Sequence, residues 1–246
     1  MAWHISMIPK IIHYCWFGRG EMPEMVRQCI ASWHRYMLEW KYILWNEENF
    51  DIASAPLYVR QAYECQKYAF VSDYVRLWAL EQYGGLYMDV DFVVYKPFDE
   101  LMDKFEAFAG IEGSKHNPVM MGVIASKAHG EWVGEMLSYY AERQFIMDDG
   151  SQDLTPNVTY LTKKMLQNGF AATGAEQEYK DLHIFPSDYF SPRKTTGEYI
   201  RSENTYCETR GLNSWAGNGN WKTRILMRLP NKWKIAIINV KRKLFG

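Results

Sequence analysis

The sequence predicts an α/β fold, a mostly parallel sheet flanked by helices in a single domain. Segments with strand patterns alternate with segments in which apolar residues recur every three or four positions. The chain has 246 residues, 48% hydrophobic and 23% charged, with a net charge of -1, which suits one globular core. No internal repeat and no linker-like stretch divides it.

Proline and glycine residues mark the ends of several expected elements. Pro9 and Gly18 flank the first strand, and Pro23 stands at the start of the first helix, where its missing N–H is no loss. Gly84 and Gly85 end a long helical region and precede an apolar strand. The expected strands are 8–17, 42–45, 86–95, 107–111, 120–125 and 182–185. The expected helices are 23–36, 131–143 and 157–167, with further helices within 55–83.

The composition excludes several classes of protein. The apolar fraction is too high for a disordered chain, and the 17 Gly and 9 Pro follow no collagen-like period. The four cysteines form no C-x-x-C pair, which favours reduced thiols and a cytoplasmic location. We expect neither a membrane span nor a signal peptide, since no apolar run is long enough and charged residues interrupt the N-terminal stretch.

Basic residues gather at the C-terminal end. Residues 1–208 carry -1 minus 9, or -10, because no acidic residue follows Glu208 and nine basic residues do. Residues 221–246 interleave basic with apolar side chains, which predicts either an amphipathic segment on an anionic membrane or a helix packed on the body. No nucleic-acid-reading module accompanies them, so we expect no nucleic-acid partner. The nine residues are Arg210, Lys222, Arg224, Arg228, Lys232, Lys234, Lys241, Arg242 and Lys243.

The clearest chemical feature is a D-x-D pattern, Asp89-Val90-Asp91, at the end of an apolar segment. On a strand this spacing places both carboxylates on one face. Two neighbouring carboxylates repel unless a cation compensates, and a divalent ion that bridges phosphate oxygens would do so. The preceding helix, Gly-Gly turn and strand place them at a sheet edge, where ligands bind in α/β proteins.

A second group of polar residues lies one helix upstream. Ser72, Asp73 and Arg76 are three or four positions apart, so they can share a helix face. An exposed ion pair of this kind contributes only tenths of a kcal/mol, but this helix leads into the D-x-D strand, which favours ligand binding. We expect His13 to be a hydrogen-bonded core residue. Trp16 fits either the core or a ligand-binding surface.

These motifs resemble glycosyltransferase family 32, D-x-D sugar transferases that include bacterial capsular polysaccharide enzymes and yeast mannosyltransferases. The catalytic domain of the large clostridial glucosylating toxins is a more distant resemblance. Four stretches carry it in order and spacing: Ile8–Gly18, Ser32-Trp33, Ala69–Arg76 and Gly84–Asp91. The resemblance implies a GT-A fold, Rossmann-like and nucleotide-sugar-binding, which we place at residues 1–220, with 221–246 as the basic amphipathic segment. It also implies an Mn²⁺ or Mg²⁺ ion and retention of the anomeric configuration.

The same resemblance implies roles for particular residues. Trp16 would stack on the nucleotide base, Asp91 would be the main metal ligand, and Asp89 would contact ribose and sugar hydroxyls. Arg76 would stabilise the negative charge that the departing diphosphate gains. The residues implied as catalytic are Asp73, Arg76, Asp89 and Asp91. Those implied for donor binding are Cys15, Trp16, Phe17, Ser72, Asp73, Arg76, Tyr87, Asp89, Ser214 and Trp215.

The C-terminal half departs from the family pattern. The family carries a histidine pair shortly before a Ser-Trp, whereas here no histidine precedes Ser214-Trp215 in the stretch 207–213. Either an oxygen of Asn213, Ser214 or Glu208 completes the metal site, because hard cations accept such ligands, or the metal is held more weakly than is usual in the family.

The turn before the last expected helix has two interpretations. Asp153 and Thr155 precede Pro156 and are candidates to cap the helix that begins at Asn157. The same residues resemble the family's Thr-x-Pro turn near the donor sugar. Both interpretations stay open at this stage.

The expected function is transfer of a hexose from a UDP- or GDP-sugar to a glycan or lipid-linked glycan, in capsular or surface polysaccharide synthesis. A basic C-terminal segment would suit peripheral contact with the inner membrane face. One alternative is a nucleotide-sugar-binding protein without turnover, motivated by the absent histidines. Another is a haloacid-dehalogenase-like phosphatase, whose D-x-D-x-(Thr or Val) motif Asp89–Val93 also fits, although that motif belongs near an N-terminus.

Overall fold

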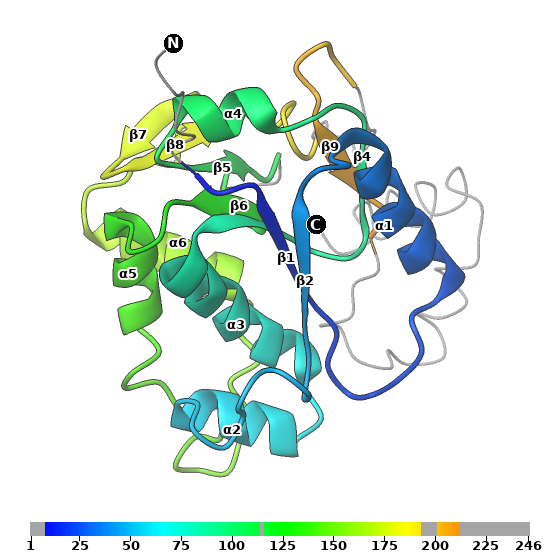
Figure 1. The fold of residues 1–246 in the computed structure, drawn as a ribbon. Helices are drawn as coiled ribbons and strands as arrows, with labels where there is room; N and C mark the ends of the chain where they lie inside the picture. The colour runs from blue at the N-terminus through cyan, green and yellow to red at the C-terminus, as the bar shows by residue number, and fades with distance from the viewer. Residues whose placement is uncertain (1–7, 114–115, 193–200, 212–246) are drawn as a thin grey trace, which may run out of the picture. The chain divides into compact units, whose positions relative to one another are not determined.

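The computed structural model describes residues 8–113, 116–192 and 201–211 (Figure 1). The strands are β1 (Ile11–Cys15), β2 (Lys41–Trp45), β3 (Gly85–Met88), β4 (Phe92–Val94), β5 (Ala107–Ile111), β6 (Val119–Ser126), β7 (Gln177–Tyr179), β8 (Leu182–Phe185) and β9 (Cys207–Thr209). The helices are α1 (Glu24–Tyr36), α2 (Leu57–Glu64), α3 (Tyr68–Tyr83), α4 (Asp99–Lys104), α5 (Glu131–Ser138) and α6 (Asn157–Gln167). The predicted basic segment 221–246 lies outside the described residues.

The strand directions confirm the predicted α/β class. One sheet has seven strands in the order β2-β1-β3-β6-β5-β8-β7, and β4 and β9 form a second, two-stranded sheet. β1 is parallel to β2 and β3, and β5 is parallel to β8. Only β6 and β7 run against their neighbours, so five of the seven strands share one direction.

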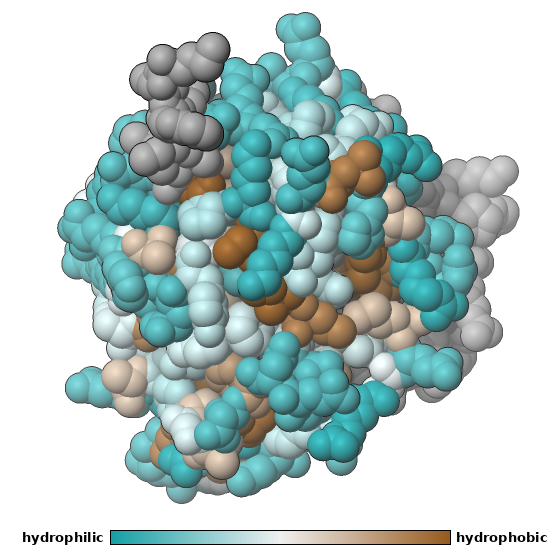
Figure 2. All heavy atoms as spheres, viewed as in Figure 1, coloured by the Kyte–Doolittle hydropathy of each residue, from teal (hydrophilic) through white to brown (hydrophobic). Residues whose placement is uncertain are grey.

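The large sheet separates two hydrophobic clusters. On β3, Tyr87 packs with residues of α2, α3, α5 and α6, whereas Leu86 and Met88 pack with residues of α1, α4 and β4. This alternation is the two-residue period of a strand that is covered on both faces. Figure 1 shows α2, α3 and α5 grouped away from α1. In the same view, apolar side chains lie at the centre of a mostly hydrophilic face, near the partly buried edge strand β2 (Figure 2).

A glycine pair turns α3 directly into β3. The Gly84 N–H donates to the carbonyl oxygen of Leu80 at 2.8 Å and closes the last turn of the helix. Gly85 has a φ of +118°, and a Cβ there would lie 2.6 Å from the carbonyl oxygen of Ile11 on β1. Only glycine therefore lets β3 start beside β1, which places the end of α3 and the D-x-D motif on adjacent elements.

Most predicted elements are confirmed, and the differences have physical reasons. The predicted strand 86–95 is wrong, because the chain leaves the large sheet after Met88 and enters the small sheet at Phe92. The elements β4, β7 and β9 have three residues each, too few to show a period. The short helix α4 was missed for the same reason.

Candidate functional site

The two D-x-D carboxylates lie in a turn between two sheets. Asp89, Val90 and Asp91 link the end of β3 to the start of β4. The prediction that a single strand places both side chains on one face is therefore wrong. The two carboxylates still interact, because the negative charge of Asp91 raises the pKa of Asp89.

Asp89 is held by residues that precede it. The Tyr87 hydroxyl donates to Oδ1 at 2.8 Å, and Nη2 of Arg76 lies 3.4 Å from the same oxygen. A Cβ on Gly122 of β6 would come within 2.9 Å of Oδ2, so glycine leaves room for this carboxylate. Desolvation raises the pKa of Asp89 to about 6; Arg76 opposes this rise and Asp91 adds to it. The side chain stays 37% exposed and is accessible to a ligand.

Arg76 is a buried guanidinium that joins three elements. From α3, its Nη1 donates to the carbonyl oxygen of Met121 on β6 at 2.5 Å. Its Nη2 donates to Oδ1 of Asp73 at 2.9 Å, and its guanidinium carbon lies 4.7 Å from the centre of the Tyr87 ring. Burial lowers the pKa of Arg76, but the nearby charges, that of Asp89 foremost, raise it overall. A permanent positive charge is therefore fixed beside the D-x-D turn.

Asp73 connects α3 to the start of α6. Its Oδ2 accepts the backbone N–H of Asn157 at 3.4 Å while its Oδ1 accepts Arg76. Burial raises the pKa of Asp73, and Arg76 and the Asn157 N–H oppose that rise. The predicted clustering of Asp73 and Arg76 on one helix face is thus observed, with both side chains buried. Ser72, on the same helix, donates its hydroxyl to the carbonyl oxygen of Tyr68 at 3.1 Å.

The turn before α6 is arranged differently from the predicted cap. The N-cap residue is Pro156, which offers no side-chain acceptor. Asp153 instead accepts Nη2 and Nε of Arg143 at 2.8 and 3.0 Å, and Thr155 gives its carbonyl oxygen to Arg143 at 3.1 Å. The capping prediction is wrong because a buried arginine engages these residues.

Asp91 is held by β9 and by the residue that follows it. β4 pairs antiparallel with β9, which sets Phe92 opposite Thr209. The Thr209 hydroxyl donates to Oδ2 of Asp91 at 3.1 Å, and the Arg210 N–H donates to its carbonyl oxygen at 2.7 Å. Sequence reasoning missed Thr209, because 118 positions separate it from Asp91 and no local pattern signals the pairing.

The donor set at the turn suits a hard divalent cation. Mg²⁺ is commonly held by one or two carboxylates together with substrate phosphates. Asp89 and Asp91 provide such a pair of carboxylates. Within the described ranges, no three histidine, cysteine or acidic side chains gather to hold a metal. Glu208, one proposed extra ligand, is buried in an ion pair with Arg201 at 2.9 Å. Asn213, Ser214 and Trp215 lie outside the described residues.

The end of β1 presents its residues to opposite faces. Cys15 and Phe17 are buried in the cluster with α3, while Trp16 is partly buried and packs with the other cluster. Burial raises the pKa of the Cys15 thiol to about 12, so this cysteine is unreactive. Trp16 donates its indole N–H to the carbonyl oxygen of Gly20 at 2.6 Å. Its stacking on a base stays a prediction.

His13 is the core residue that the sequence predicted. Its Nε2 donates to the Gly84 carbonyl oxygen at 2.8 Å, and its Nδ1 accepts the indole N–H of Trp45 at 3.1 Å. These two bonds require the neutral ring. Burial lowers the pKa of His13 to about 4.

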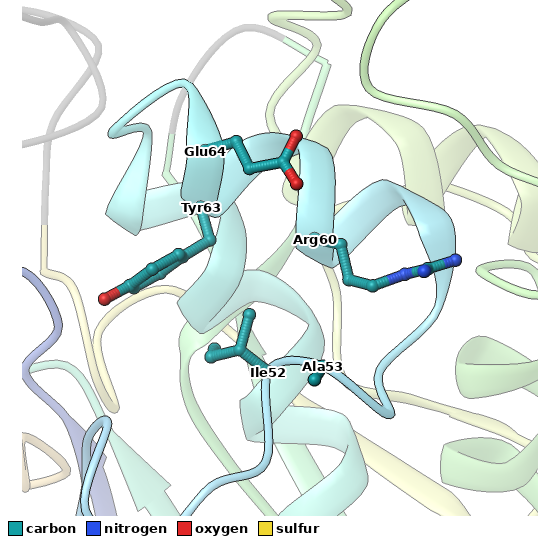
Figure 3. Close-up of a pocket in the computed structure, with 5 residues that line it drawn as sticks. All are labelled: Ile52, Ala53, Arg60, Tyr63 and Glu64. Carbon is teal, nitrogen blue, oxygen red and sulfur yellow. The ribbon is translucent and has the colours of Figure 1, made fainter.

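A shallow hollow of about 410 Å³ lies between α2 and the loop before it (Figure 3). It is lined by Ile52, Ala53, Arg60, Tyr63 and Glu64. Arg60 and Tyr63 point in different directions in Figure 3, so they do not converge on one ligand. None of the predicted donor-binding residues that the structure describes lines this hollow.

Part of the chain matches a known protein family. Residues 23–107, which include α3 and the D-x-D turn, match the family described as "Glycosyltransferase sugar-binding region containing DXD motif". This part of the chain is similar to a DXD-type glycosyltransferase sugar-binding region. The predicted family resemblance is therefore confirmed.

Two curated relatives come from Schizosaccharomyces pombe (strain 972 / ATCC 24843). Inositol phosphoceramide mannosyltransferase 1 is 31% identical over 110 residues, 41% of this chain and 33% of that protein. Inositol phosphoceramide mannosyltransferase 3 is 32% identical over 101 residues, 39% of this chain and 28% of that protein. The match thus spans about a third of the relatives' length.

Two solved structures of glycosyltransferases have a distantly similar fold. The PaToxG glycosyltransferase aligns with a TM-score of 0.48 and 18% identity over 66% of this chain and 70% of that one. The galactosyltransferase LgtC, solved with donor and acceptor sugar analogues, aligns with a TM-score of 0.44 and 13% identity over 91% and 99% of the two chains. Among the described residues, no helix combines the length and apolar character needed to cross a bilayer.

Proposed function

We propose that this protein transfers a hexose from a nucleotide sugar to a glycan or glycolipid acceptor. One observation carries the proposal: Asp73, Arg76 and Asp89 form a connected ionic network at the D-x-D turn, inside the region that matches the sugar-binding family. The names of the two yeast relatives put mannose first among the sugars to test and a lipid-linked acceptor first among the acceptors.

The residues of this site would have different roles. Asp89 and Asp91 would hold Mn²⁺ or Mg²⁺, which when bound would neutralise the phosphate charge of the donor. Arg76 is fixed by Asp73 and by the Met121 carbonyl, so its charge is in place where negative charge develops on the departing diphosphate. We propose retention of configuration by a front-face route on the family resemblance alone, and assign no nucleophile.

The second candidate is sugar-nucleotide binding without turnover. Within the described ranges, no third metal-binding side chain joins Asp89 and Asp91, and Glu208 is engaged by Arg201. A site that binds a nucleotide sugar but holds its cation weakly would bind without cleaving. The phosphatase alternative is weaker, because it does not account for the matched residues upstream of the D-x-D turn.

The test is release of nucleoside diphosphate from a panel of UDP- and GDP-hexoses with manganese, with magnesium and with a chelator. The proposal expects release from one donor that depends on the cation and is lost in Asp91→Asn. Binding of a donor without release would favour the binding protein. Release of inorganic phosphate from a sugar phosphate would favour the phosphatase.

We also propose a cytoplasmic enzyme at the inner membrane face, active in capsular or surface polysaccharide synthesis. The support is the nine basic residues after Glu208 and the apolar residues among them. Removal of residues 222–246 should reduce binding to vesicles that contain anionic phospholipid and leave donor cleavage intact. Unchanged vesicle binding would contradict the membrane contact and leave the transferase proposal standing.

A further inference from the structure

A threonine from the far end of the described chain contacts the D-x-D turn. The Gly211 N–H donates to Oγ1 of Thr209 at 3.0 Å, and Oγ1 lies 3.1 Å from Oδ2 of Asp91. Because a backbone N–H only donates and a carboxylate only accepts, the single hydroxyl hydrogen of Thr209 goes to Asp91. The direction of this hydrogen bond is therefore determined.

The contact restricts one particular carboxylate. The Arg210 N–H holds the carbonyl oxygen of Asp91 at 2.7 Å, and Thr209 holds its Oδ2. The backbone and the side chain of Asp91 are thus both held by two consecutive residues at the end of β9, Arg210 and Thr209. Groups that hydrogen-bond a metal-binding carboxylate fix its orientation and raise metal affinity.

We propose that Thr209 is a positioning residue that orients Asp91 toward a divalent cation. The inference rests on the proposed function, since it takes Asp91 to be a metal ligand. It assigns a role to the stretch 207–213, in which this chain has no histidine. Thr209 acts through Asp91 and does not touch the cation itself.

The chain offers matched variants that separate this role from a structural one. Thr209→Val removes the hydroxyl, and with it the acceptor of the Gly211 N–H, but it keeps the β-branched shape that suits β9 and the backbone pairing of β9 with β4. Thr209→Ser restores a hydroxyl. Thr205→Val is the control. Thr205 lies four residues before Thr209, and its hydroxyl donates to the carbonyl oxygen of Asp188 at 2.8 Å. Within the described residues, no contact joins Thr205 to Asp91.

The experiment measures Mn²⁺ affinity of the full chain by electron paramagnetic resonance of free Mn²⁺, with UDP and with GDP present. Thr209→Val should weaken Mn²⁺ binding about 10- to 100-fold, the usual loss when a partner of a metal ligand is removed. Thr209→Ser should bind within about threefold of the wild type. Thr205→Val should bind as the wild type does.

Each outcome decides the inference. Wild-type affinity in Thr209→Val, or an equal loss in Thr205→Val, would overturn it even if the enzyme turns over. Weakened Mn²⁺ binding in Thr209→Val alone would support it even if no donor is cleaved and the transferase proposal fails. A wild-type chain that binds no Mn²⁺ with either nucleotide would overturn both.

Discussion

Asp89 and Asp91 are two residues apart, yet different parts of the chain hold them. Asp89 is bound by Tyr87 and Arg76, which lie within 13 positions before it. Asp91 is bound by Thr209 and Arg210, more than 100 positions after it. The first arrangement is local and leaves a buried positive charge beside the carboxylate, whereas the second is a strand pairing that only the folded chain creates. Mutations on the Asp89 side and on the Asp91 side of the turn should therefore have different consequences.

The largest expected effect is a loss of stability when the buried positive charge beside Asp89 is removed. Arg76→Gln leaves Asp73 and Asp89 without their cation in a buried setting, so the free energy of unfolding should fall by about 3–5 kcal/mol. Urea denaturation at neutral pH measures this change. Arg27→Gln is the control, because the Arg27 and Glu24 side chains are 57% and 66% exposed in their ion pair, and it should cost about 1 kcal/mol or less. Equal losses in the two variants would contradict the distinction.

Asp91→Asn removes the charge of the second carboxylate with little change in volume. Asn can still accept the Thr209 hydrogen bond, so the fold should persist while the negative charge at the turn is lost. Donor cleavage should fall by about 10²–10³-fold. The readout is nucleoside diphosphate release at saturating manganese, with thermal unfolding as the check on folding. Undiminished release would mean that Asp91 is not a metal ligand.

The burial of His13 predicts a loss of stability on acidification. The folded pKa of about 4 lies below the usual 6.5, so the unfolded chain takes up the proton first as the pH falls. The stabilisation is complete above pH 6.5 and decreases as the pH falls toward 4. Between pH 7 and pH 5 this group alone should lower the free energy of unfolding by about 2 kcal/mol.

The control for His13 is His13→Gln, whose amide can both donate to Gly84 and accept from Trp45. The comparison is the difference between wild type and variant in urea denaturation at pH 7 and pH 5. Subtracting the variant removes the contribution of Asp89, whose raised pKa acts in the opposite direction. An identical pH dependence in the two proteins would show that His13 takes up its proton equally in both states.

The local half of the site could be predicted from the sequence and the distant half could not. Asp73, Arg76 and Asp89 share a helix, a glycine turn and a strand, so periodicity and spacing suffice to bring them together. Thr209 reaches Asp91 through a three-residue strand that has no period of its own, and its partner β4 was predicted as a continuation of β3. Gly122 was missed for a related reason, because only the pairing of β3 with β6 places it beneath Asp89.

The smallest expected effect concerns Trp16, which packs on the side of the sheet opposite Cys15 and Phe17. If its partly buried ring also stacks on the donor base, Trp16→Ala should weaken UDP or GDP binding by about 1–2 kcal/mol, roughly 5- to 30-fold. Trp16→Phe keeps an aromatic face and should lose less than Ala, although it removes the N–H that holds Gly20. Isothermal titration calorimetry with manganese present measures both. Equal and small losses in the two variants would assign Trp16 to the core alone and leave the ionic network around Arg76 and Asp89 as the part of the site that holds the donor.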